Sequence, residues 1–199
     1  MPKTFKFYES GQELDPRFSC TLQSQRCVAT KGNGQGRCGN KTVMGVPVCW
    51  VHLLKDHKLR IAKSRIAEAG KGLFATKSRT INPNPQRTAE NLVFRREEKI
   101  IEYVGDQINE QEMGRRYGNK TGPYALETRR DHIVDAACKR AAAAFANHKP
   151  FAQANARFSR SPDGKIYIRA TKHIYDGDEI YLYYGSSYKF NDGSQHRTV

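Results

Sequence analysis

Three cysteines and one histidine near the N-terminus have the types and spacing of metal ligands. Cys27, Cys38, Cys49 and His52 are separated by ten, ten and two residues, and glycines punctuate the interval. Thiolates and an imidazole suit zinc, and four such ligands close a tetrahedral structural site. The segment holds few aliphatic residues, so a metal would supply stability that a small core cannot. The spacing therefore predicts a structural zinc site at these four residues.

Two alternatives to this ligand set stay open. Cys20 could replace one of the four ligands, although its spacing is poorer. The thiols could also be unligated, with His52 and His57 on a surface helix. If zinc is bound, the site would be structural or recognitive rather than catalytic, because no coordination position stays open.

A second group of residues that could do chemistry lies toward the C-terminus. Asn147-His148 precedes two short alternating segments, and the second of these holds tyrosines at positions 181, 183 and 184. Each buried phenol hydroxyl needs a hydrogen-bond partner, so tyrosines gathered beside an Asn-His pair are unusual for ordinary core. We therefore expect a polar site where these segments converge.

Short strands must position this second group. Asp163-Gly164 and Asp176-Gly177 predict turns, each followed by an alternating strand, at 166–169 and from 180. Upstream, the pattern predicts strands at 59–66, 73–75, 100–104, 123–127 and 132–135, a loop at 77–91, a short helix at 110–117 and one or two helical turns at 138–146. Many short strands with little helix indicate a mainly β domain.

Four motifs in this order resemble the SET domain. Its start is resembled by residues 70–75 and 100–106, its middle by Ile133-Val134-Asp135-Ala136, and its end by Asn147-His148, Gly177-Asp178-Glu179-Ile180 and Tyr184-Gly185. The resemblance covers roughly residues 64 to 190. It implies a mainly β fold with short helices, a β-clip-like set of small sheets with a C-terminal pseudoknot, preceded by the small zinc module. Since SET domains are S-adenosylmethionine-dependent protein lysine methyltransferases, it implies that activity and that cofactor.

The resemblance also implies roles for single residues. Tyr184 and Tyr103 would be catalytic, and with Leu182 they would line the substrate channel. Leu182 stands where relatives carry Phe or Tyr, so the channel should leave room for two or three methyl groups. The cofactor would be bound by Ala69, Gly70, Lys71, Tyr124, Asn147 and His148.

The chain departs from the family pattern in two places. The usual Ser-Cys-x-Pro-Asn after Asn-His is replaced by residues 149–155, with a small insertion. The cysteine-rich tail that closes the channel in many relatives is absent, so Tyr188, Phe190 or another chain would take its place. These departures favour an alternative, a catalytically weak SET-like scaffold that binds chromatin or nucleic acid through its basic zinc module. The retained tyrosines and Asn-His pair favour the enzyme.

Charge indicates further partners. The net charge is +14, and residues 1 to 65 carry 12 basic against 4 acidic residues. Such a field favours polyanions, so we expect contact with DNA or a nucleosome besides a protein substrate such as a histone. No apolar run has membrane-spanning length and no signal peptide is evident, so we expect an intracellular protein, nuclear if eukaryotic. The expected division is an arm at 1–19, the zinc module at 20–58, the SET domain at 59–190 and a polar tail at 191–199.

Overall fold

A computed structural model describes residues 25–32, 34–42, 46–118, 122–186 and 188, together with the backbone of four short strands nearer the N-terminus. These strands form two antiparallel pairs, β1 (Lys3–Lys6) with β4 (Ser19–Leu22) and β2 (Tyr8–Glu9) with β3 (Gln12–Glu13). The side chain of Cys20 and the whole of Phe190 lie outside the described residues. Within the described chain, no helix has the length and apolar character needed to cross a membrane.

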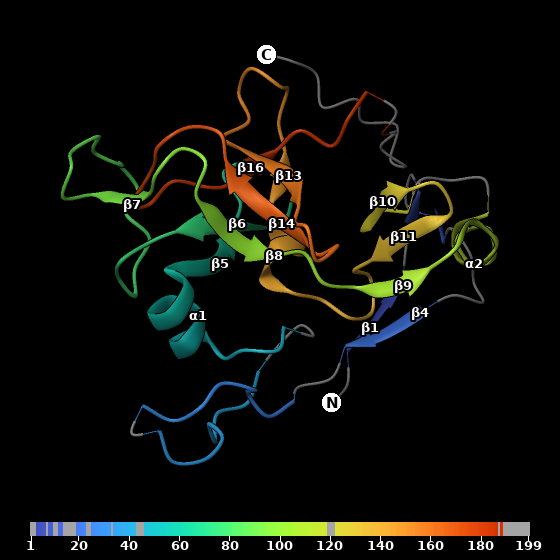
Figure 1. Ribbon diagram of the computed structural model, residues 1–199, viewed down its shortest axis with the longest axis horizontal. Helices are drawn as coiled ribbons and strands as arrows, with labels where there is room; N and C mark the ends of the chain where they lie inside the picture. Colours follow the sequence, from blue (N-terminus) through green and yellow to red (C-terminus); the bar gives the residue numbers. More distant parts are fainter. Residues whose placement is uncertain are drawn as a thin grey trace.

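Small sheets and two short helices make up the described chain (Figure 1), which confirms the predicted fold class. Helix α1 (Trp50–His57) leads into the antiparallel pair β5 (Leu59–Lys63) and β6 (Lys71–Ala75). The chain turns between helix and strand at Lys58, whose left-handed backbone lets its N–H bond to the carbonyl of Leu54. After the predicted loop, β7 (Leu92–Phe94) pairs with β15 (Ile174–Tyr175).

A five-stranded sheet forms the centre of the C-terminal half. Its strand order is β12-β16-β13-β14-β8, with bounds Asn147–His148, Tyr181–Leu182, Ala156–Arg160, Ile166–Ala170 and Lys99–Glu102. Strand β16 lies between β12 and β13 and is parallel to both, so the loop that joins those two strands closes around it. This threading matches the pseudoknot that the sequence implies, and it lays the C-terminal tyrosines along the Asn-His pair.

A smaller sheet stands at the other end of the molecule (Figure 1). It has the order β10-β11-β9, with bounds Ala125–Arg129, His132–Asp135 and Asp106–Ile108. Helix α2 (Glu110–Tyr117) follows β9, and its N-cap residue Asn109 accepts a hydrogen bond from the Glu112 N–H at 2.8 Å. The two sheets are joined at Gly105, where an added Cβ would lie 2.5 Å from the Asp135 backbone. Only glycine allows this approach.

The hydrophobic core runs through both sheets, and an alanine-rich segment passes through it. Ala142, Ala143 and Ala146 are buried, and the segment forms one 3-10 turn, η1 (Ala142–Phe145). The sequence predicted one or two helical turns over 138–146, and the structure has one. Packing of the small side chains against the core decides the backbone here rather than the helix propensity of alanine.

Candidate active site

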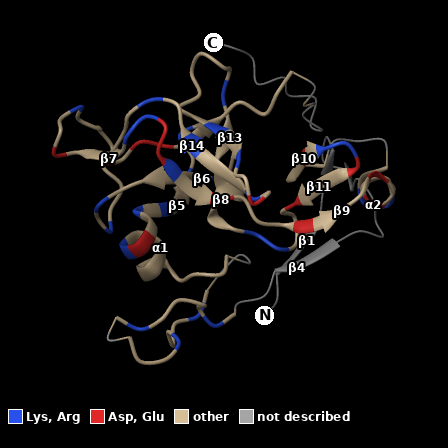
Figure 2. Cartoon of the chain, in the orientation of Figure 1, with Lys and Arg blue, Asp and Glu red and all other residues tan. Residues whose placement is uncertain are grey.

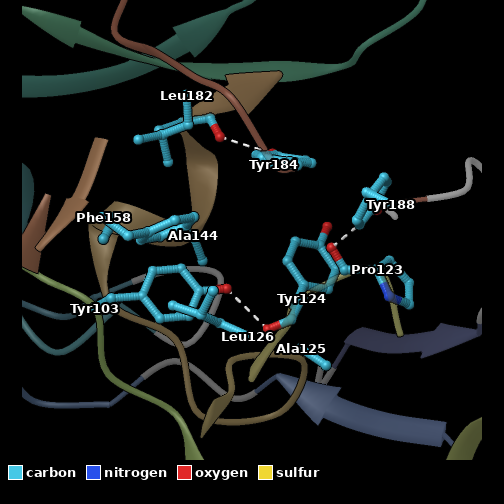
Figure 3. A pocket seen from close by; sticks show the side chains of 12 residues that line it. Tyr103, Pro123, Tyr124, Ala125, Leu126, Ala144, Phe158, Leu182, Tyr184 and Tyr188 are labelled. Atoms are coloured by element: carbon cyan, nitrogen blue, oxygen red, sulfur yellow. Dashed lines mark hydrogen bonds between the residues drawn. The ribbon is translucent and has the colours of Figure 1, made fainter. Parts of the chain in front are cut away.

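Two tyrosine hydroxyls define a buried channel between the two sheets. A cavity of about 40 Å³ is lined by Tyr103, Leu182 and Tyr184, the three predicted channel residues, among others. The Tyr103 hydroxyl donates to the backbone oxygen of Tyr124 at 2.8 Å, as Figure 3 shows. The Tyr184 hydroxyl donates to the backbone oxygen of Ala146, also at 2.8 Å. Since each phenol has a single proton, both oxygens keep their lone pairs for a further donor.

Burial sets the protonation of both phenols. It raises the pKa of Tyr103 and of Tyr184 well above the usual tyrosine value, and neighbouring phenols and, for Tyr103, the carboxylate of Asp135 raise it further. Both groups are therefore neutral across the physiological pH range. They can orient a substrate amine by accepting from its N–H, but they do not act as tyrosinate bases.

A second, wider cavity of about 390 Å³ adjoins the channel. All six residues predicted to bind a cofactor line it: Ala69, Gly70, Lys71, Tyr124, Asn147 and His148. They come from the β5–β6 turn, from the residues before β10 and from β12, which are separated by up to about 80 positions in the sequence. The structure thus brings the predicted set around one space, while its binding role stays a prediction.

The two cavities meet at Tyr184. This residue lines both of them, as do Tyr124 and Tyr188. The Tyr188 ring packs edge-on against Tyr184 with centroids 4.9 Å apart. A group held in the wide cavity and one held in the narrow channel would therefore face each other at the Tyr184 ring. This is the arrangement that an in-line transfer between two bound molecules needs.

A buried carboxylate fixes the wall of the wide cavity. Glu179 is 2% exposed and accepts from the Ser64 hydroxyl at 2.7 Å, the Arg65 N–H at 2.7 Å and the Tyr181 hydroxyl at 2.9 Å. The Asn147 amide joins this network and also donates to the Lys71 carbonyl at 3.0 Å. That amide nitrogen therefore holds the β5–β6 turn in place, a role the sequence did not reveal.

Gly72 completes this wall. An added Cβ there would lie 2.1 Å from the Glu179 carboxylate oxygen, so no larger residue fits. Glycine at position 72 is thus required by the buried Glu179 carboxylate, independently of any ligand in the wide cavity.

His148 and Tyr184 are fixed to each other through the parallel pair β12 and β16. The Tyr184 N–H donates to His148 Nδ1 at 3.1 Å, so His148 carries its proton on Nε2 in this arrangement. The loop of residues 149–155, where the chain departs from the family pattern, begins with the Lys149 N–H bonded to the Leu182 carbonyl. The departure therefore leaves the strand pairing beside Tyr184 intact.

Three residues at the site were missed or only named in passing by sequence reasoning. Phe158 lines the channel and packs edge-on against Tyr103 at 5.4 Å. Arg140 is buried in the wall of the wide cavity, with its guanidinium 4.1 Å from the Tyr124 ring. Tyr188 lines both cavities, and it was expected only as one of two residues that could close the channel. Only the strand alternation around 158 offered a signal for Phe158.

The predicted zinc ligands also come together. Their ligand atoms all lie within 4.8 Å of one another and are buried. His52 Nδ1 lies 3.6 Å from the Cys27 sulfur and 3.3 Å from the Cys49 sulfur. A tetrahedral zinc would hold a sulfur and a nitrogen about 3.5 Å apart, so the donor set and its spacing fit that metal.

Hydrogen bonds around the cluster favour thiolate. The Cys49 N–H points at the Cys27 sulfur at 3.2 Å, and the Asn40 side chain points at the Cys49 sulfur at 3.5 Å. Burial alone would raise the pKa of Cys49, but hydrogen bonds from the His52 backbone and from Asn40 outweigh it and hold the pKa at about 6. Burial raises the pKa of Cys27, so that thiol would ionise when metal binds.

Comparisons with solved structures show the fold. The chain is similar to the Chaetomium thermophilum polycomb repressive complex 2, with 23% identity over 65% of this chain and a TM-score of 0.52. It is also similar to ctPRC2 bound to S-adenosylmethionine (21%, 68%, 0.51) and to ctPRC2 in complex with H3K27me3 and H3K27M (24%, 64%, 0.51). The aligned part is 14 to 16% of those chains.

Sequence comparison identifies one domain within the chain. No curated protein sequence matches the chain. The SET-domain family matches residues 91–185, so the N-terminal motif at 70–75 lies outside the matched range. The match and the SET-like fold agree with the tyrosine channel and the threaded strand β16. Residues 91–185 of this chain are a SET domain, and a Cys/His cluster lies on its N-terminal side.

Proposed function

We propose that this chain is an S-adenosylmethionine-dependent protein lysine N-methyltransferase. The SET domain and the SET-like fold support a protein methyltransferase. The observation that carries the proposal is the meeting of the narrow tyrosine-lined channel and the wider cavity at Tyr184. A lysine side chain is long, thin and apolar up to its amine, and it suits the narrow channel.

The residues around the wide cavity suit S-adenosylmethionine, which supplies an electrophilic methyl group on a sulfonium. The turn at Ala69, Gly70 and Lys71, held by the Asn147 amide, and the edge formed by Asn147 and His148 would bind it. A neighbour of known structure is bound to the same molecule. The Tyr124 ring, between Arg140 and the channel, would separate the cofactor from the substrate.

The channel residues would align and desolvate the amine. Burial in an apolar channel disfavours the ammonium, so the amine loses its proton more readily there. The Tyr184 and Tyr103 oxygens would accept from its N–H groups and direct its lone pair toward the wide cavity. Alignment and desolvation supply most of the rate in such a displacement, because no covalent intermediate is needed.

We propose a histone or another chromatin-associated protein as substrate, and a nuclear location if the source is eukaryotic. One neighbour is ctPRC2 in complex with H3K27me3 and H3K27M. Acidic residues of β9, α2 and the β10–β11 hairpin, red in Figure 2, would attract a basic protein segment despite the net charge. We further propose structural zinc at Cys27, Cys38, Cys49 and His52.

The test is methyl transfer from radiolabelled S-adenosylmethionine to a panel of core histones, free and in nucleosomes. Labelled lysine in at least one histone, absent with a Tyr184→Phe variant, would support the proposal. The control is that the chain is correctly folded and loaded with zinc. If such a chain transfers no methyl group to any histone or to a lysate of basic proteins, the result would favour the alternative, a SET-like scaffold without catalysis.

A further inference from the structure

A basic groove lies outside the candidate active site, beside α1. Its volume is about 670 Å³, and none of its lining residues borders either active-site cavity. Its apolar part consists of Trp50, Val51 and Leu54 from α1. The remaining lining residues are all cationic: Lys55, Lys58, Arg60, Lys77 and Arg79.

Helix α1 presents this groove because its other face is occupied. Cys49 precedes the helix, and His52 and Leu53 are buried toward the Cys/His cluster and the core. Residues four apart share a helix face, so Trp50, Leu54 and Lys58 follow one another along the outer side. Trp50 is 39% exposed and Val51 is 51% exposed. The chain's single tryptophan therefore stays partly in water, which marks a surface for binding rather than for packing.

Among the described residues, no carboxylate neutralises the cations of the groove. None of the five makes an ion pair with a described acidic side chain. Arg60 and Lys77 donate to the backbone oxygens of Arg79 and Glu90, which orients them but leaves their charge in place. Basic residues of α1 and the neighbouring strands are blue in Figure 2. The groove thus combines a positive field with an exposed aromatic ring.

We propose that this groove binds a single strand of nucleic acid. A chain of phosphates suits a groove that five cations line, and an unpaired base can stack on Trp50. A duplex keeps its bases stacked inside, so it would leave the apolar part of the groove unused. The rival ligand is an acidic peptide with apolar anchors. The net charge of +14 over the whole chain favours the ligand with the denser and longer charge.

The proposal sharpens the expectation of a DNA or nucleosome contact and is independent of methyl transfer. Binding is measured on the full, zinc-loaded chain by fluorescence anisotropy with a labelled DNA strand of about 15 nucleotides, over a range of salt concentrations. The same strand annealed to its complement, and a poly-glutamate peptide of similar length, serve as competitors. We expect the single strand to bind tighter than either.

Charge variants test the electrostatic part. The double variant Lys55→Gln/Arg79→Gln removes one cation on α1 and one on the segment after β6. The slope of the logarithm of the binding constant against the logarithm of the salt concentration should therefore become about 1.4 shallower. The matched control is Arg129→Gln/Arg130→Gln, which removes the same charge from the β10–β11 hairpin at the other end of the molecule (Figure 1). The control should leave the slope nearly unchanged. An equal fall in both variants would overturn the assignment to this groove.

A tryptophan variant tests the stacking part. Trp50→Ala should weaken single-strand binding about tenfold with an unchanged salt slope, and Trp50→Phe should restore most of the affinity. Circular dichroism and zinc content confirm that each variant is folded. Tighter binding of the duplex, stronger competition by poly-glutamate, or unchanged binding in Trp50→Ala would each overturn the proposal. Methylation of a free peptide should be the same in the Lys55→Gln/Arg79→Gln and Trp50 variants, because the groove lies apart from the channel.

Discussion

The Cys/His cluster and the tyrosine channel are both buried groups of polar side chains, but they depend on different things. The cluster joins residues between positions 27 and 52, and its local core holds little besides the three cysteines, Ala29 and Val48. The channel joins Tyr103 to Tyr184 and packs against the main core that runs through both sheets. The proposed zinc would therefore be needed for the cluster to fold, whereas the channel is shaped by the fold before any ligand binds.

Removing the metal should have the largest effect and should be confined to the cluster. Purified protein should contain about one zinc per chain, and Cys38→Ser or a strong chelator should unfold the segment around it, since zinc supplies on the order of 10 kcal/mol to such modules. Metal analysis and hydrogen exchange check this. The strands of the SET domain should keep their protection. If protein prepared without chelator contained no metal and its Cys/His segment were still protected from hydrogen exchange, the contrast between the cluster and the channel would be wrong.

Loss of the Tyr184 hydroxyl should have the largest effect on the reaction. Tyr184→Phe keeps the ring that packs against Tyr188 and His148 but removes the oxygen that orients the amine. We expect a fall in kcat on the order of 100-fold with the fold retained, and only a small fall in the melting temperature from the lost hydrogen bond to Ala146. Tyr183→Phe is the matched control, since Tyr183 is 36% exposed and lines neither cavity. Full activity of the Tyr184→Phe variant would show that the Tyr184 hydroxyl has no catalytic role.

A pH profile separates orientation from base catalysis at the same residue. Because the pKa of Tyr184 is raised, the rate should climb with pH as the substrate amine deprotonates and show no step from a tyrosinate. The raised pKa also adds stability that is present below pH 10 and is lost as pH rises through the folded-state value. A rate step below pH 9 that disappears in Tyr184→Phe would contradict this protonation state.

A smaller effect is expected at Asn147, which tests whether the wide cavity depends on contacts between distant parts of the sequence. Asn147→Ala removes the hydrogen bonds to Lys71, Ser64 and Glu179, so the β5–β6 turn should loosen and the affinity for S-adenosylhomocysteine should fall by about 1–3 kcal/mol. Calorimetry measures it, with Asn84→Ala in the exposed loop after β6 as the control. Equal affinity in the two variants would show that the wide cavity is not the cofactor site.

The same contrast explains what the sequence could predict. Ligand types and spacing were enough for the Cys/His cluster, because its residues are close along the chain. Turn residues and alternation located seven strands of the SET-like part, and they missed β7, β9, β12, β13 and β15. The network around Glu179 could not be predicted, since Ser64 and Glu179 are 115 residues apart. Neither residue belongs to a local sequence pattern that indicates the other as its hydrogen-bond partner. The channel residues were reached through the order of motifs, whereas Phe158 and Arg140, which lie outside those motifs, were missed.

Leu182 gives the finest test, because its effect should fall on the product rather than on the rate. Its side chain is buried in the channel wall together with Phe158 and Tyr103, and it offers no hydroxyl to hold a water beside the amine. The channel should therefore admit a methylated amine, and the wild type should yield di- or trimethyl-lysine. Leu182→Tyr adds a ring and a hydroxyl, which should shift products toward monomethyl-lysine while the first transfer slows only a few-fold. Leu182→Met, similar in volume, is the control and should keep the wild-type products. Mass spectrometry of the methylated substrate resolves the three states. The same product distribution in Leu182→Tyr and Leu182→Met would mean that residue 182 does not limit the channel, and that its width is set elsewhere on its wall.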